Sequence, residues 1–397
     1  MKQYLTTTIL CLSIAISGCA QSGQSTEPKD AQKQLELGLH YYDEDNYIQA
    51  VYWYKKAAEQ GLAEAQYHLG LCYFNGRGVT QDEAQAVYWY KKAAEQGHVR
   101  AQCNLGRCYY NGYGIVFDYT QSMYWYRKAA EQGDAQAQHT LAEHYHDGYG
   151  TVDYAQAIYW YEKAGEQGYV FAQQALGFYC YLGILPQDYA KAAYWNKKAA
   201  EQGSVDGQYY LGLSYYNGYG VPQDYTQAAY WFQKAAEQGY LYGQFYLGTC
   251  YKNGQGVAQD YAQAAYWYKK AADRGYAEAQ YYLGTGYALG NGVPQNYSQA
   301  IYWLKKAAEQ GQIDAQFSLG ECYCKNGVTQ DYTLAVHWFR KAAEQGDAEA
   351  QLYLGVLYYD GTGVDKDYKQ AVYWLKQAAT QGNVEAKNIL RELSESD

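Results

Sequence analysis

Ten tryptophans at nearly constant spacing constrain the fold of this chain more than any other feature. Each lies in a copy of one phrase, of which residues 86–97 are an example, and neighbouring tryptophans stand 35 or 36 residues apart. This period predicts a stack of small repeats rather than one globular core, because each unit can bury its apolar side chains only against its neighbours. The 397-residue chain has no other tryptophan than Trp53, Trp89, Trp125, Trp160, Trp195, Trp231, Trp267, Trp303, Trp338 and Trp374.

Within one repeat the sequence predicts two antiparallel helices. Ala63 to Asn75 is expected to form the first helix, and Gly76 suits a left-handed cap at its end. Asp82 is well placed to cap the start of the second helix, which is expected to run to Gln96. We therefore predict an all-α solenoid of ten helix pairs at residues 33–382, followed by a capping helix at residues 383–397. The first pair lacks the longer glycine-rich loop.

A rotation of 100° per residue sorts the faces of the first helix. Leu69, Gly70 and Tyr73 fall on the core face, Gln66 falls on the core side, and Trp89 of the second helix is expected to fill the space between repeats. A polar side chain that recurs on a packed face must find hydrogen-bond partners. We therefore expect a ladder of glutamines that fixes the register of neighbouring first helices, formed by Gln66, Gln102, Gln138, Gln173, Gln208, Gln244, Gln280, Gln316 and Gln351.

The opposite face of the first helices carries the candidate binding residues. They stand two before, two after or five after the core leucine, and rings with a polar tip are good anchors for a peptide or a sugar. We expect them to line a binding groove; the alternative is that they pack against adjacent first helices. The candidates are Tyr67, Phe74, Tyr110, His139, His146, Tyr209, Tyr216, Phe245, Tyr281, Phe317 and Tyr359.

The sequence predicts neither a metal site nor a cofactor. His144 falls about 160° around its helix from His139 and His146, which makes a common metal site awkward. Seven cysteines lie in the repeats, and four of them share the position three residues after the core leucine. We expect buried free thiols, with a structural disulfide as the alternative. The seven are Cys72, Cys103, Cys108, Cys180, Cys250, Cys322 and Cys324.

The N-terminus has the layout of a secretory signal, with Lys2 followed by an apolar stretch too short to span a bilayer. Small residues directly before Cys19 resemble the lipobox of bacterial lipoproteins. That resemblance implies a signal peptide at residues 1–18, a lipid on Cys19, and sorting to the outer membrane because Ala20 follows the cysteine. An ordinary signal peptide, cut elsewhere, is the alternative. Residues 19–32 are polar and are expected to form a flexible tether.

The repeat pattern Ala-Gln-x-x-Leu-Gly-x-x-Tyr, then Gly-x-Gly-Val-x-x-Asp-Tyr-x-x-Ala-x-x-Trp-x-x-Lys-Ala-Ala-x-x-Gly, resembles the Sel1-like repeat, a relative of the tetratricopeptide repeat. The resemblance covers nearly all of the chain from about Lys33. It implies a right-handed α-superhelix whose first helices line the concave face. It also implies an adaptor that binds a protein or peptide in its groove.

Charge and motifs limit the remaining function classes. The formal charge is −10 and no block of basic residues occurs, which disfavours nucleic acid as a partner. Ser-x-x-Lys and Lys-Thr-Gly, the motifs of serine hydrolases of the β-lactamase type, are absent. We therefore expect a monomeric, non-enzymatic scaffold on the periplasmic side of the outer membrane. Alternatives are a binder of peptidoglycan or another glycan and, more remotely, a β-lactamase-like hydrolase related to cysteine-rich repeat proteins.

Overall fold

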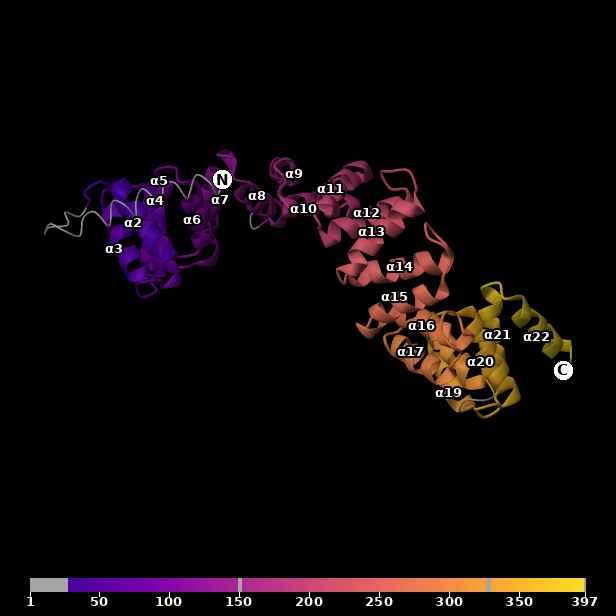
Figure 1. Ribbon diagram of the computed structural model, residues 1–397. Coiled ribbons are helices and arrows are strands. Elements are labelled where there is room, and N and C mark those ends of the chain that lie inside the picture. Colours follow the sequence, from indigo (N-terminus) through magenta and orange to yellow (C-terminus); the bar gives the residue numbers. More distant parts are fainter. Residues whose placement is uncertain (1–27, 149–151, 326–329, 396–397) are drawn as a thin grey trace. The chain divides into compact units, whose positions relative to one another are not determined.

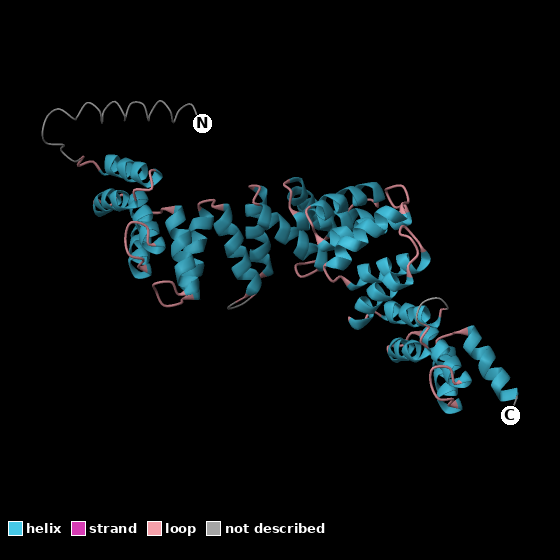
Figure 2. Cartoon of the chain, turned by 60° about the horizontal axis from the view of Figure 1, so that its bottom comes forward, coloured by secondary structure: helices cyan, strands magenta, loops and turns pink. Residues whose placement is uncertain are grey.

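The computed structural model describes residues 28–148, 152–325 and 330–395. Within these ranges the regular structure is entirely helical, without strands (Figure 2). No helix in the described part of the chain combines the length and the apolar character that crossing a membrane requires. The expected signal peptide and Cys19 lie outside the described residues, and so does most of the expected tether. The first described helix begins at Ala31, two residues before the predicted start of the repeats.

The helices alternate between first and second members of ten antiparallel pairs, as predicted. The first helices are α2 (Ala31–Asp43), α4 (Ala63–Asn75), α6 (Val99–Asn111), α8 (Ala135–Asp147), α10 (Val170–Leu182), α12 (Val205–Asn217), α14 (Leu241–Asn253), α16 (Ala277–Leu289), α18 (Ile313–Cys324) and α20 (Ala348–Asp360). The second helices are α3 (Tyr47–Glu59), α5 (Glu83–Glu95), α7 (Tyr119–Glu131), α9 (Tyr154–Glu166), α11 (Tyr189–Glu201), α13 (Tyr225–Glu237), α15 (Tyr261–Asp273), α17 (Tyr297–Glu309), α19 (Tyr332–Glu344) and α21 (Tyr368–Thr380). The capping helix is α22 (Val384–Glu395).

The chain divides into two compact units, which the uniform repeat spacing did not predict. Unit 1 ends at Tyr169 and contains α2 to α9, and unit 2 begins at Val170 and contains α10 to α22. The boundary therefore falls between the fourth and fifth helix pairs. Within each unit, successive helices pack against one another in chain order (Figure 1).

The predicted caps explain where the helices begin and end. The Asp82 carboxylate accepts a hydrogen bond of 2.9 Å from the Gln85 backbone N–H at the start of α5. Gly76 follows α4 with φ of +69°, a left-handed conformation that side chains other than glycine rarely adopt. In the first pair the short loop places Asp45 at a positive φ instead, a conformation that aspartate tolerates better than most residues.

In nine of the ten first helices a core glycine makes room for the residue that follows the tryptophan, and in α8 Ala142 takes its place. A Cβ atom built on Gly70 would lie 2.7 Å from the Tyr90 ring, and Tyr90 is fully buried. The same contact recurs between Gly212 and Phe232 and between Gly320 and Phe339. The position after the tryptophan is buried in all ten pairs and holds an aromatic ring in seven of them, although the sequence drew attention to the tryptophan itself.

The tryptophans join neighbouring repeats, as expected. Trp89 packs into a cluster that includes Tyr54 and Ala57 of the preceding pair. Seven of the ten are buried, but Trp231, Trp267 and Trp374 are only partly buried. The tryptophan ladder therefore contributes less evenly to stability than its regular spacing predicts.

The recurring glutamines are buried and hydrogen-bonded, but not with one another across first helices, and the side-chain oxygen of Gln244 has no partner among the described residues. The side-chain amide of Gln66 donates to the Ala58 carbonyl at the end of α3, 3.1 Å away. Its oxygen accepts from the amide of Gln96, which caps the end of α5, at 2.8 Å. The glutamine therefore connects its first helix to the two flanking second helices. This corrects the expected ladder between first helices: the partners are a carbonyl near the end of one second helix and the cap residue of the other.

Candidate functional site

The predicted groove residues all lie on first helices, but adjacent repeats cover much of their surface. Tyr67 and Tyr209 are buried, with 8% and 9% exposed, which corrects the expectation that they face away from the core. The other nine are partly buried: Phe74, Tyr110, His139, His146, Tyr216, Phe245, Tyr281, Phe317 and Tyr359. The cause is packing between neighbouring repeats, because the position two before the core leucine contacts the residue that caps the next first helix.

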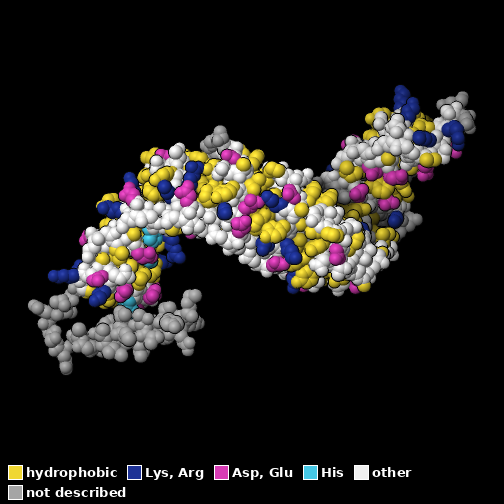
Figure 3. Space-filling view, turned by 90° about the horizontal axis from the view of Figure 1, so that it is seen from above, with side chains coloured by type: hydrophobic (Ala, Val, Ile, Leu, Met, Phe, Trp, Pro, Cys, Tyr) yellow, Lys and Arg dark blue, Asp and Glu magenta, His cyan; other side chains and the backbone are white. Residues whose placement is uncertain are grey.

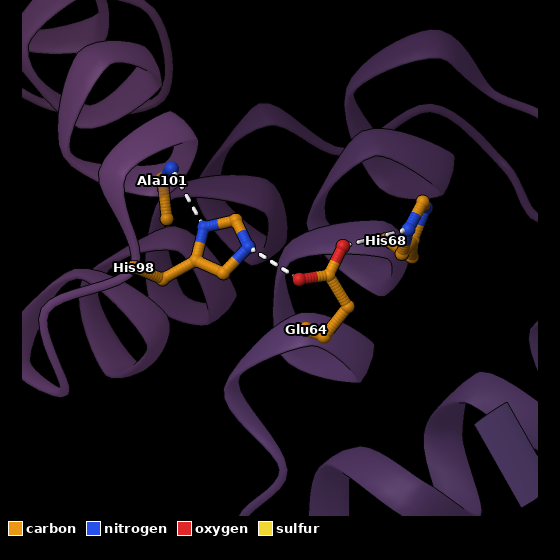
Figure 4. A network of polar contacts seen from close by, with 4 residues as sticks. All are labelled: Glu64, His68, His98 and Ala101. Atoms are coloured by element: carbon orange, nitrogen blue, oxygen red, sulfur yellow. Dashed lines mark hydrogen bonds and ion pairs between the residues drawn. The ribbon is translucent and has the colours of Figure 1, made fainter. Parts of the chain in front are cut away.

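In unit 1 this contact is part of an ionisable network, shown in Figure 4. His98, the residue before α6, stacks on Tyr67 with ring centroids 4.6 Å apart. Its Nδ1 accepts from the Ala101 backbone N–H at 3.1 Å, so its Nε2 carries the proton toward Glu64, 3.0 Å away. The other Glu64 oxygen lies 3.3 Å from Nε2 of His68. Burial lowers the pKa of His68, although Glu64 opposes that effect.

The three histidines of α8 do not converge. His144 is buried among Tyr110, Tyr119 and other rings, and burial lowers its pKa to about 4. His139 lies 3.5 Å from Glu143 and His146 lies 2.9 Å from Asp147. Among the residues that the structure describes, no group of three or more His, Cys, Asp or Glu side chains could hold a metal ion.

In unit 2 the corresponding surface is a network of tyrosines that touch one another. Tyr209 lies 5.2 Å from Tyr240 and 5.8 Å from Tyr242, measured between ring centroids. Tyr242 in turn lies 5.5 Å from Tyr276, which lies 5.1 Å from Phe245. Packing therefore holds these rings in fixed positions, while 41% of Tyr242 remains exposed. We call the surface of the first helices of unit 2 the first-helix face.

Several of these residues were missed by the sequence analysis. Tyr240 and Tyr276 stand directly before first helices, and Tyr242 and Tyr246 stand five and one before the core leucine. Tyr353 of α20 is also 40% exposed. A comparison of equivalent positions between repeats could have found them, because tyrosines replace charged or small residues there.

The second helices present a different surface. An exposed tyrosine precedes nine of the ten tryptophans. In eight of these helices the lysine four residues on lies over its ring, as with Lys56 over Tyr52 at 4.5 Å and Lys306 over Tyr302 at 5.0 Å. On the described part of the face seen in Figure 3, hydrophobic side chains, tyrosine included, are interspersed with both acidic and basic ones. These exposed tyrosines are natural controls for those of the first-helix face.

The seven repeat cysteines are free thiols, and five of them are buried. Burial raises the pKa of Cys72 to about 12 and that of Cys108 to about 11. Such thiols carry almost no thiolate at neutral pH, which suits a packing role rather than nucleophilic chemistry. The prediction of buried free thiols is confirmed for Cys72, Cys108, Cys180, Cys250 and Cys322, while Cys103 and Cys324 are partly exposed.

Comparison with known proteins agrees with this architecture. The Sel1 repeat family matches ten consecutive segments, at 34–62, 63–98, 99–134, 135–169, 170–204, 205–240, 241–276, 277–312, 313–347 and 348–383. Among solved structures, the chain is similar to c5321, described as a protective antigen present in uropathogenic Escherichia coli strains displaying an SLR fold. The two are 44% identical over 92% of this chain and 80% of that one, with a TM-score of 0.85.

A second similar structure is a Sel1 repeat protein from Oxalobacter formigenes. It is 30% identical over 94% of this chain and 98% of its own, with a TM-score of 0.47. No curated protein matches the chain. The ten segments matched by the Sel1 repeat family run without a break from residue 34 to residue 383.

Proposed function

The chain belongs to the Sel1 repeat family, and from this premise we propose that it is a non-enzymatic scaffold that binds a protein or peptide partner. The tetratricopeptide-like fold of Sel1 repeats is typical of protein–protein interaction scaffolds. We place the binding surface on the first-helix face of unit 2. The observation that carries this choice is the network of touching tyrosines around Tyr242.

The physical argument is one of low entropic cost. Tyrosine offers a large contact area and a hydroxyl group with few rotatable bonds, so it is a common anchor in protein interfaces. The neighbouring rings already restrict Tyr242, which lowers the cost of ordering it on binding. Exposed tyrosines on second helices contact a tryptophan and a lysine of their own helix instead. Within the described residues, the ring contacts of Tyr230 and Tyr266 are with the tryptophan of their own helix, whereas those of the first-helix face connect neighbouring repeats.

The test is capture of a partner by the mature chain from membrane extracts, beside sedimentation with purified peptidoglycan sacculi. Replacement of Tyr242 and Tyr353 by Ser should reduce capture of the same protein at least tenfold. Replacement of Tyr230 and Tyr266, which are equally exposed on second helices, should leave capture unchanged. Sedimentation with sacculi in the absence of any captured protein would replace the proposal with the glycan-binding alternative.

We also propose that Cys19 carries a lipid that holds the chain at the outer membrane, facing the periplasm. The support is the run of small residues before Cys19, the apolar stretch that precedes it, and Ala20 after it. Cys19→Ser should move the protein from the membrane fraction to the soluble fraction of the envelope. Unchanged membrane retention of this variant would contradict a lipid anchor.

A further inference from the structure

Two departures from the repeat pattern meet in unit 2, and the first is Gly286. It stands three residues after the core leucine Leu283, where most other repeats place a buried side chain. A Cβ atom built on Gly286 would have only the Asn291 carbonyl oxygen within 4 Å, at 3.3 Å. Apart from this one tight contact, the missing side chain leaves space around Gly286. The buried residues at the equivalent position are Cys72, Cys108, His144, Ser214, Cys250, Cys322 and Leu357.

The second departure is Lys252, five residues after the core leucine of α14. Phe74, Tyr110, Tyr216 and Tyr359 are among the residues at this position in other repeats. Lys252 is the one basic residue within the six first helices of unit 2, α10 to α20. A cation thus stands at a position where most other repeats carry a ring, with Ala288 and Cys324 as the other exceptions in unit 2.

The surroundings of Lys252 leave its charge without a counterion. Its Nζ lies 4.1 Å from the centroid of the Tyr282 ring, which is stacked on Tyr268 with centroids 5.2 Å apart. No carboxylate in the described ranges forms an ion pair with it, whereas Lys269 of α15 pairs with Asp273 at 2.8 Å. Burial lowers the pKa of Lys252. A partly buried ammonium is stabilised by an anion that reaches it.

These two residues line the same pocket, of about 340 Å³. Its walls include Lys252, Gly286 and the rings of Tyr261, Tyr268, Tyr281 and Tyr282. Tyr281 is the one residue of the predicted groove that contributes. The volume is at the small end of the range for ligand pockets, about 300–1,000 Å³, and suits one or two amino-acid residues. The lining combines flat apolar faces with a single positive charge.

We propose that this pocket binds a carboxylate-bearing residue of the protein partner, with the carboxylate at Lys252 and the carbon chain against the tyrosine rings. The proposal rests on the proposed function and specifies the chemistry of the partner at one point of the first-helix face. One isolated cation on a chain of net charge −10 favours a single carboxylate, because a polyanion would be repelled by the rest of the surface. A free C-terminus or an acidic side chain supplies the same group.

The test measures weak binding of short probes to the mature chain by saturation-transfer NMR titration. The probes are acetyl-Leu-Glu-amide, acetyl-Leu-Gln-amide, acetyl-Leu with a free carboxylate, and glucuronate. The acidic peptide and acetyl-Leu should each bind at least fivefold more tightly than the glutamine peptide. Their relative affinities distinguish a side chain from a chain end. Equal affinity for the Glu and Gln peptides, or tighter binding of glucuronate than of every peptide probe, would overturn the proposal.

Variants of the pocket residues test whether the acidic probes bind there. Gly286→Cys introduces the residue that four other repeats carry at this position, so it should fold normally, fill the pocket and weaken binding of the acidic probes at least fivefold. Lys252→Gln should remove the preference for Glu over Gln. Ser214→Cys makes the matching change in α12 and should alter nothing. Circular dichroism verifies that Gly286→Cys is folded. If this variant binds the acidic probes as tightly as wild type, the probes bind elsewhere and the assignment of this pocket is wrong.

The two proposals fail in different ways. If wild type captures a protein partner but Gly286→Cys and Lys252→Gln have no effect on the acidic probes, the pocket assignment is wrong and the scaffold function stands. If wild type shows the pocket-dependent preference for Glu but captures no protein, the pocket stands and the scaffold function is wrong.

Discussion

The same three positions carry ionisable groups at α4 and α6 of unit 1 and aromatic rings at α14 and α16 of unit 2. Glu64, His68 and His98 form a bridge of polar contacts around the start of α4 and α6. Tyr242, Tyr246 and Tyr276 hold the equivalent positions at α14 and α16. The backbone plan is common to both. The difference teaches that packing fixes the repeat, while the exposed positions of the first helices are free to change chemistry.

The packing beneath these positions is preserved in detail. His68 stacks on the buried Tyr54 with centroids 5.2 Å apart, and Tyr246 stacks on the buried Phe232 at 5.1 Å. Imidazole rings change charge near neutral pH, whereas a phenol does not. Six of the seven histidines of the chain lie in unit 1, and only His337 lies in unit 2. The two units are therefore expected to respond differently to pH and to partners.

The largest effect should follow from removing a buried ring from one unit. Phe232→Ala should destabilise unit 2 by about 3–5 kcal/mol, because Phe232 is fully buried against Gly212. Trp231→Ala should have a smaller effect, because Trp231 is only partly buried. Hydrogen exchange in urea, followed on peptides from both units, measures each separately. Equal loss of protection in unit 1 would show that the two units unfold as one.

A common packing feature should instead give the same effect in both units. Gln102→Ala in unit 1 and Gln280→Ala in unit 2 each remove two hydrogen bonds: the one donated to a buried carbonyl, of Ala94 or Ala272, and the one accepted from the cap residue of a second helix. Each should cost about 1–3 kcal/mol in its own unit. Gln263→Ala, on the exposed side of α15, should change stability by less than about 0.5 kcal/mol. A marked difference between the two buried sites would argue against a shared role.

Acid should destabilise unit 1 more than unit 2. The pKa of His144 is lowered to about 4 in the folded chain from an ordinary 6.5, so the unfolded chain binds more protons between those values. Stability is therefore complete above about pH 6.5 and is lost as the pH falls toward 4. At pH 5 unit 1 should lose roughly 1–2 kcal/mol through His144, from about 1.4 kcal/mol per unit of pKa shift.

Hydrogen exchange at pH 7.5 and 5 measures this loss, after correction for the intrinsic rate. His144→Cys, which restores the residue found at Cys108, should remove it in large part. Burial also lowers the pKa of His139 to about 4. Part of the loss of stability at pH 5 should therefore remain in His144→Cys. Equal acid sensitivity in wild type and His144→Cys would mean that other groups control the stability of unit 1.

How much of this could be read from sequence depends on how local the signal is. The period, the caps and the core leucine with its glycine follow from short-range patterns, and their predictions are confirmed. The buried glutamines were found by helix geometry, but their partners lie in second helices about 8 and 30 residues away in the chain. A single-helix projection contains no information about those neighbours.

The predicted groove residues show more clearly what a helix projection cannot predict. Helix projection placed Tyr67 away from the core of its own repeat, yet the ring is buried because His98 of the next repeat covers it. The sequence analysis did not predict the pocket at Gly286, because the only sign of it in the sequence is the absence of a side chain. Its effect appears only when α14, α15 and α16 are packed together.

The smallest effect concerns the ionic network of unit 1. Glu64→Gln should change stability by less than about 1 kcal/mol, because the carboxylate is half exposed and water competes for its contacts. Chemical denaturation with the unit-resolved hydrogen-exchange readout checks this. A loss of several kcal/mol would mean that the bridge, rather than the buried rings, holds α4 against α6.

The central claim is that the first-helix face of unit 2 binds a partner, and site-specific photo-crosslinking tests it most directly. A benzophenone amino acid placed at Tyr242 or Tyr353 in the full chain, expressed in its cell envelope, should crosslink one and the same protein. The same group at Tyr230 or Tyr266 on second helices should not. Equal crosslinking from both sets of positions, or crosslinking only from Tyr230 and Tyr266, would contradict the assignment of the first-helix face.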